Sequence, residues 1–180
     1  WTPDGSGFFY ARNPRPGTVP KNEEHLHVKV YFHKIGVPPK DDKLIFGVDR
    51  PKDDLIHLSI SPDGKYLAIS AFQKWTENEI HLYDIKKESL KPLITNIPSQ
   101  FSVRFLRDKI IIHTNYKANN YRILFASFDN IYDPIEQWSE LIPQQEYLLD
   151  VMAVTSYKLL LAYLVDAFFQ VTLLGHDGKD

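Results

Sequence analysis

The stretch that decides the fold is residues 61–69, SPDGKYLAI. It joins a turn to an apolar strand, because proline presets φ, aspartate hydrogen-bonds its own backbone and glycine adopts positive φ. Residues 2–10, TPDGSGFFY, have the same form, and weaker versions begin at Leu106 and Thr155. The starting positions are separated by 59, 45 and 49 residues, so the chain contains a repeat.

A second kind of strand follows each of these turns. Its apolar and polar residues alternate, which indicates a half-buried antiparallel strand. Such strands are expected at residues 27–33, 80–85, 121–126 and 169–173, and shorter apolar runs close the first three units at 43–46, 92–94 and 140–142. No long window has helical spacing, although one helical turn fits between Pro134 and Pro143.

A repeat of about 40 to 50 residues with four short strands is typical of a β-propeller blade. The sequence therefore predicts an all-β segment of four-stranded antiparallel blades, at roughly 1–48, 49–97, 98–143 and 144–180, the last incomplete. The first blade is expected to open inside its first strand, at Trp1. A β-sandwich also has many short strands, but the grouping into units favours the propeller. A closed propeller needs at least about four complete blades, so we expect further chain in the whole protein.

Composition excludes several classes of function. The chain has 21 Lys and Arg against 23 Asp and Glu, so no excess of positive charge is available for nucleic acid. It has no cysteine and therefore no disulfide or thiolate metal site. No apolar run approaches the 18 or so residues of a membrane span, and no Asn-x-Ser/Thr sequon occurs. These features predict a cytoplasmic protein without membrane or nucleic-acid partners.

Motifs for catalysis and for cofactor binding give little signal. The nucleophile elbow Gly-x-Ser-x-Gly does not occur, and Ser6 is interpreted as a turn residue. His25 and His27 would share one face of an extended strand, a geometry that could bind zinc, but no third ligand is evident, and surface or cavity-facing histidines are the favoured interpretation. No glycine-rich phosphate loop is present. We expect neither a metal nor a cofactor.

The first unit is longer than the others by about 14 residues, which fall at 13–26. Three prolines, one glycine and four charged residues give this segment the composition of a loop. A long loop without structure of its own is usually functional or disordered. Both interpretations stay open here.

Several stretches resemble the prolyl oligopeptidase family. Residues 1–10 and 25–36 resemble parts of its blades, and residues 114–123, TNYKANNYRI, resemble its Thr-Asn…Asn-Tyr-Arg-Leu signature. Trp138 and residues 141–143 follow in the order that the family has, and the resemblance extends along essentially the whole chain. In the signature itself, Thr114 and Asn115 suit a strand-end cap, and Arg122 suits a pair with a neighbouring carboxylate.

The resemblance implies a serine peptidase in which a seven-bladed propeller covers an α/β-hydrolase domain. Short peptides enter a cavity between the two and are cut after proline, and all three catalytic residues lie in the hydrolase domain, outside this chain. About three and three-quarter of the seven blades are then present. Two alternatives stay open: a propeller that serves as a protein-interaction platform, and an oligopeptidase that cuts after basic residues.

The resemblance also implies candidate site residues. Leu55, Phe72 and Trp75 match positions that face the substrate cavity, where an apolar wall would suit peptide side chains upstream of the proline; plain packing within the blade is the alternative. The family has shorter or polar residues at some of these places. The loop 13–26 matches a family loop that gates entry. Its candidate residues are Asn13, Arg15, Lys21, Glu23, Glu24 and His25.

Overall fold

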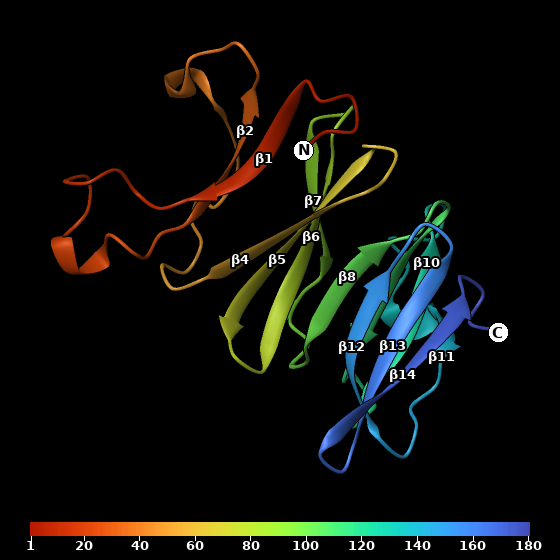
Figure 1. The fold of residues 1–180 in the computed structure, drawn as a ribbon. Helices are drawn as coiled ribbons and strands as arrows, with labels where there is room; N and C mark the ends of the chain where they lie inside the picture. The colour runs from red at the N-terminus through yellow and green to blue at the C-terminus, as the bar shows by residue number, and fades with distance from the viewer. The chain divides into compact units, whose positions relative to one another are not determined.

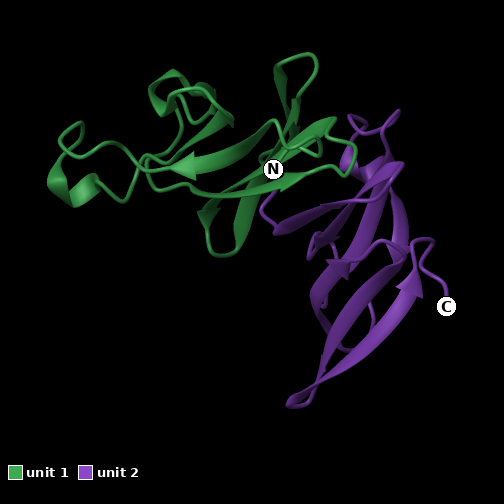
Figure 2. Cartoon of the chain, turned by 45° about the horizontal axis from the view of Figure 1, so that its top comes forward, with its two compact units in different colours: residues 1–96 green, residues 97–180 purple.

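The computed structural model describes all residues from Trp1 to Asp180. Fourteen strands form four antiparallel sheets, and the helices are three 3₁₀ turns of three residues each. The all-β prediction is confirmed. The chain divides into two compact units, Trp1–Asn96 and Ile97–Asp180, each of which contains two sheets (Figure 2).

The first unit begins with a three-stranded sheet in the order β1-β2-β3 (Figure 1). Its elements are β1 (Gly7–Arg12), η1 (Lys21–Glu23), β2 (Lys29–Lys34), η2 (Pro39–Asp41) and β3 (Lys43–Phe46). The second sheet has four strands in chain order: β4 (Leu55–Ile60), β5 (Tyr66–Lys74), β6 (Glu77–Asp84) and β7 (Ser89–Ile94). Each strand pairs with the next one along the chain, as in a blade.

The second unit repeats this meander twice. Its four-stranded sheet contains β8 (Phe101–Phe105), β9 (Lys109–Thr114), β10 (Arg122–Ser127), η3 (Ile135–Gln137) and β11 (Ser139–Ile142). The helical turn expected after Pro134 is η3. The last sheet has three strands, β12 (Leu148–Val154), β13 (Lys158–Val165) and β14 (Phe168–Gly175). The limits that the sequence suggested for the blades stay a prediction.

The repeated turns are held by their own polar side chains. At Ser61 the hydroxyl donates to Asp63 Oδ1 over 2.6 Å and accepts the Tyr66 N–H over 2.9 Å, while Gly64 has φ +69°. Thr2 accepts the backbone N–H of Gly7 in the same way, over 3.1 Å. A short polar cap with glycine at the left-handed position therefore closes both turns.

The position of these turns between strands corrects the expectation for the start of the chain. The turns at Ser61, Leu106 and Thr155 join the first and second strands of their sheets. The turn at Thr2 leads directly into β1, so β1 corresponds to a second strand, and the first sheet has no counterpart of β4. The expectation that the chain opens inside a strand at Trp1 is therefore wrong. Trp1 and Thr2 precede the turn, and the first strand begins at Gly7.

Each unit has its own apolar core between its two sheets. In the first unit Val30, Ile69 and Ala71 are fully buried, with Phe46 and Leu67 beside them. In the second unit the core joins the facing sides of the third and fourth sheets, through Ile111, Ile123, Leu149, Leu159 and Leu161. Burial of each large aliphatic side chain stabilises the fold by about 1.5–3 kcal/mol. This packing fixes the strands on which the candidate residues lie.

Candidate functional site

Leu55 and Phe72 lie next to each other at one end of the second sheet. Leu55 is the first residue of β4 and pairs with Phe72 of β5 in the antiparallel ladder. Alternation along β4 places Ile56 in the core with the first sheet, so Leu55 and Phe72 project from the opposite face. The Leu55 side chain is 57% exposed, and Phe72 is half-buried. The pair therefore forms an accessible apolar surface at the end of the sheet.

Trp75 lies at the tip of the hairpin that joins β5 and β6. The ladder shifts register between Phe72 and Lys74, and an ion pair of 2.5 Å between Lys74 and Glu77 closes the hairpin. Trp75 is 86% exposed. The structure brings Leu55 and Phe72 together in the ladder and places Trp75 three residues beyond Phe72. Their role in contact with substrate stays a prediction.

A buried ionic network adjoins the start of β4, and no sequence motif predicted it. Arg50 Nε donates to Asp54 Oδ2 over 2.7 Å, and Arg50 Nη1 donates to Glu79 Oε2 over 2.7 Å. His81 Nε2 lies 3.3 Å from the same Glu79 oxygen, and its ring packs against Phe46 at 4.9 Å. Because Asp54 directly precedes Leu55, this network fixes the position where β4 begins.

Burial and hydrogen bonding shift the pKa values of the groups in this network. Burial raises the pKa of Asp54, whose Oδ1 has no hydrogen-bond partner, and it lowers the pKa of His81. Burial also tends to raise the pKa of Glu79. Hydrogen bonds from Arg50 and then from His81 outweigh this effect, so the pKa of Glu79 is lowered. The guanidinium of Arg50 is thus the cation that these two carboxyl groups share inside the unit.

The loop between β1 and β2 is anchored at its C-terminal end. Glu23, at the end of η1, accepts from Lys52 Nζ over 2.7 Å and lies 2.8 Å from His27 Nε2. The His27 N–H donates to the Lys52 carbonyl over 2.6 Å. The hydrogen bonds with His27 and then with Lys52 lower the pKa of Glu23. The loop thus contains a 3₁₀ turn and a polar anchor, whereas the sequence suggested a segment without structure of its own.

The rest of this loop is more open. Near its start, the Thr18 hydroxyl donates to the Arg15 carbonyl over 2.7 Å, which forms a local turn. Lys21 and His25 are exposed and Glu24 is half-buried. Of the gating residues suggested by the sequence, the structure ties Glu23 alone to another segment through its side chain.

The proposed sharing of one strand face by His25 and His27 is wrong. β2 begins at Lys29, and His27 has a left-handed backbone with φ +58°, so the two histidines do not lie on an extended strand. His27 instead bonds to Glu23. No group of three or more His, Cys, Asp or Glu side chains in the chain is arranged to hold a metal ion.

The signature at residues 114–123 connects strands of the second unit. Thr114 Oγ1 accepts the Tyr116 N–H over 3.0 Å and Asn115 Oδ1 accepts the Gln100 N–H over 2.8 Å, so the pair caps the strand end. Arg122 pairs with Glu140 over 3.2 Å, which confirms the expected carboxylate partner. These residues therefore have structural roles.

His113, just before this signature, is a buried polar residue that sequence reasoning did not single out. Its Nε2 lies 2.7 Å from the Leu149 carbonyl, and its ring stacks on Tyr121 at 4.6 Å. Burial lowers the pKa of His113. The contact joins β9 to β12 across the two sheets of the second unit.

Comparison with known proteins accounts for the repeat, the sheets and the signature. The profile of the prolyl oligopeptidase N-terminal β-propeller domain matches residues 1–180. The chain belongs to the prolyl oligopeptidase family. It is 31% identical to a prolyl endopeptidase of Elizabethkingia meningoseptica and 27% identical to prolyl oligopeptidase A of Galerina marginata, over 99% of this chain in both cases. It covers 25% and 26% of those two proteins, so the chain spans about a quarter of their length.

Solved structures agree on the fold. A prolyl endopeptidase, described in a study of inter-domain dynamics in catalysis and specificity, matches 99% of the chain with a TM-score of 0.90 at 24% identity, and the chain covers 26% of it. Oligopeptidase B from Trypanosoma brucei matches 98% of the chain with a TM-score of 0.77 at 24% identity, and 24% of it is covered. The four sheets are therefore a segment of a prolyl oligopeptidase β-propeller. None of the helices has the length or the apolar character needed to cross a lipid bilayer.

Proposed function

We propose that the whole protein is a serine peptidase that hydrolyses short peptides on the carboxyl side of proline. This chain is then a part of the propeller that controls which peptides reach the active site. The observation that carries the proposal is the match of the family's propeller to every residue of the chain, supported by prolyl endopeptidases among its relatives. The catalytic serine, aspartate and histidine belong to a linked α/β-hydrolase domain outside residues 1–180.

The test uses the full-length product of the reading frame. A short chromogenic peptide ending in Gly-Pro is compared with one ending in Arg, with and without a serine-directed phosphonate. We expect cleavage after proline that the phosphonate abolishes. Cleavage after arginine alone would instead assign an oligopeptidase for basic residues, and cleavage of neither peptide would favour an interaction platform.

In this proposal Leu55, Phe72 and Trp75 contact peptide side chains upstream of the proline. The support is that Leu55 and Phe72 are cross-strand neighbours with accessible apolar surface on a sheet whose other face is buried. Covering such surface with a peptide is favourable by about 25 cal/mol per Å². A neutral, apolar wall also suits peptides of varied sequence, because it forms no specific hydrogen bonds.

The gate in this proposal is the loop 13–26, with Asn13, Arg15, Lys21, Glu23, Glu24 and His25 as its residues. Its support is the polar anchor at Glu23, which joins the loop to Lys52 and His27 by contacts that water can replace. Glu23→Gln removes the charge, so we expect faster hydrogen exchange in the loop of the full-length protein. Unchanged hydrogen exchange across the loop would contradict the proposal that the contacts of Glu23 hold the loop in place.

A further inference from the structure

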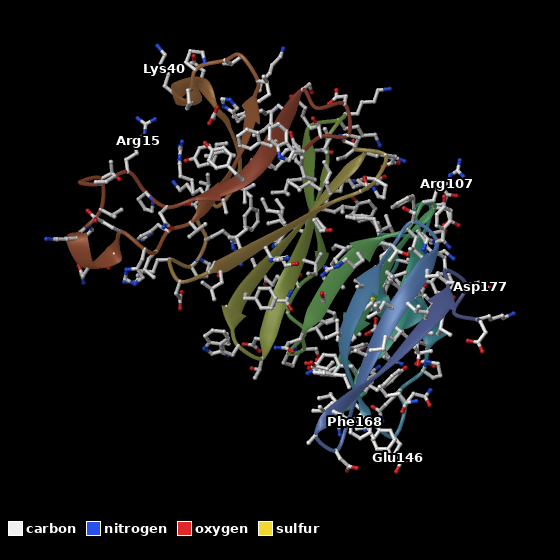
Figure 3. The ribbon with its side chains drawn as sticks, viewed as in Figure 1. Arg15, Lys40, Arg107, Glu146, Phe168 and Asp177 are labelled. Atoms are coloured by element: carbon white, nitrogen blue, oxygen red, sulfur yellow. The ribbon has the colours of Figure 1, made fainter.

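A cavity of about 380 Å³ lies between the start of the β1–β2 loop and the strands on either side of it. Three of the side chains that line it are permanent cations, and no carboxylate lines it. Its lining residues are Arg12, Asn13, Pro14, Arg15, Thr18, Val19, His27, Lys29 and Tyr31. We call this cavity the cationic pocket. Figure 3 shows Arg15 on the loop that follows β1.

Two of these cations face each other across the sheet. Arg12 is the last residue of β1 and pairs in the ladder with Lys29, the first residue of β2. Like charges directly opposite in an antiparallel pair are destabilising. Lys29 forms no ion pair in the structure, and neither does Arg15. The sheet thus holds positive charge at this point without a bonded anion.

The nearest carboxylates are engaged elsewhere. Asp42 accepts from Tyr10 over 2.5 Å and lies 2.7 Å from His33 Nδ1. The Arg12 guanidinium donates to the Tyr10 hydroxyl over 3.2 Å and forms no ion pair with Asp42. Glu23 is bonded to His27 and Lys52 and is not part of the lining. Neither Asp42 nor Glu23 therefore forms an ion pair with the three cations that line the pocket.

Two of the three cations, Arg12 and Lys29, are also held in position. The Arg12 guanidinium lies 3.9 Å from the centre of the Tyr31 ring, a cation–π contact that orients it over the pocket wall. The Lys29 stem packs over Gly47, where an added Cβ would come within 2.9 Å of Lys29 Cγ. Placement of an arginine before a ligand arrives lowers the entropic cost of binding.

We propose that the cationic pocket binds a carboxylate of a peptide, with Arg12, Lys29 and Arg15 as the groups that contact it. A carboxylate accepts charge-assisted hydrogen bonds from guanidinium and ammonium groups and relieves the repulsion between Arg12 and Lys29. The carboxylate has two possible sources, an acidic side chain or a free C-terminus. The proposal deepens the proposed function, because the ligand is a peptide of the kind that the peptidase would handle, but its test requires no cleavage.

The test measures binding of fluorescent tetrapeptides to the full-length protein by anisotropy at low salt. Acetyl-Gly-Asp-Glu-Gly-amide supplies side-chain carboxylates, acetyl-Gly-Asn-Gln-Gly with a free carboxyl supplies a terminal one, and acetyl-Gly-Asn-Gln-Gly-amide is the neutral control. None contains proline or arginine, so a failure of the peptidase proposal does not affect the result. We expect one carboxylate peptide or both to bind about tenfold more tightly than the neutral control, and more weakly as salt rises.

Variants assign the binding to the pocket. Lys29→Gln and Arg15→Gln should each weaken binding of the carboxylate peptide by about tenfold, and Lys29→Arg should retain it. Lys40→Gln is the matched control, because it removes one positive charge on η2, outside the lining (Figure 3). Equal affinity for all three peptides, or an equal loss in Lys40→Gln, would overturn the proposal. Loss in Lys29→Gln together with loss in Lys29→Arg would overturn it as well, since the charge would then not be the cause.

Discussion

Replacement of Arg50 by leucine should destabilise the propeller strongly, although residue 50 lies in a loop. The guanidinium connects Asp54, directly before β4, to Glu79 in the middle of β6. Arg50→Leu leaves both carboxylates without their cation. The exposed fractions of the three side chains are 18% for Arg50, 2% for Asp54 and 15% for Glu79, so solvent replaces little of the lost interaction.

The size of the loss in stability follows from the two carboxyl groups that Arg50→Leu leaves unpaired. Breaking a buried ion pair by removing one partner costs about 3–5 kcal/mol. Glu79 retains some contact with solvent and a bond to His81, so we expect the lower end, about 3 kcal/mol at pH 7. Because the network adjoins Leu55, we also expect the KM for proline peptides to rise.

The assay is urea unfolding of the full-length protein, in which the transition of the propeller is compared between variants. Lys43→Leu is the matched control, since it removes one cation from an ion pair of 2.6 Å with Glu88 whose side chains are 45% and 65% exposed. Exposed pairs contribute about 0–1 kcal/mol. If Arg50→Leu cost no more than Lys43→Leu, the network would not hold β4, and the reasoning would be refuted.

Three further predictions concern the turn, the buried histidine and the apolar pair. Ser61→Ala leaves the Tyr66 N–H without its side-chain acceptor and should lower the free energy of unfolding in urea by about 1–3 kcal/mol. Ser61→Thr keeps a hydroxyl and should retain most of that stability; equal losses in the two variants would contradict a role for the hydroxyl. Burial lowers the pKa of His113 below the ordinary value of 6.5, so on acidification the unfolded chain binds a proton at this residue before the folded chain does. The free energy of unfolding should therefore fall as the pH drops below about 6.5, by at most about 1.4 kcal/mol per pH unit. His113→Gln should flatten this slope, and an unchanged slope would assign it to other groups. Leu55→Ala should lower kcat/KM for a proline peptide roughly fivefold, because in the proposed function the peptide covers a side chain that is 57% exposed without it, and Leu90→Ala on β7 should have no effect.

Much of the fold is local in origin and could therefore be predicted. The turns at Thr2 and Ser61 carry their own caps and their own glycine, so a few consecutive residues define them. Alternation then identified strands such as β6 and β10 with small errors at their ends. No residue ranges were predicted for the initial strands β4, β8 and β12, because the repeat was read from the turns that follow them. For the same reason the chain was expected to start in the first strand of a blade, although β1 corresponds to the second strand.

The candidate site was less predictable, because its parts meet only in the folded chain. Leu55 and Phe72 were singled out by resemblance, and their pairing depends on the register of β4 with β5. Arg50 and Glu79 are 29 residues apart in the sequence, and nothing local distinguishes them from solvent-exposed charges. The same holds for Arg12 and Lys29, whose opposition across the ladder is created by a long loop between them.

The most direct test of the central claim offers one proline-containing sequence to the full-length protein in two contexts. A proline-containing segment is offered as a free peptide of about ten residues, and as an exposed loop in a stable folded domain. Under the proposed function, we expect the free peptide to be cut after proline and the folded domain to stay intact, because a propeller that acts as a filter would admit only short chains. Cleavage of both at similar rates would contradict a role of this chain as a filter.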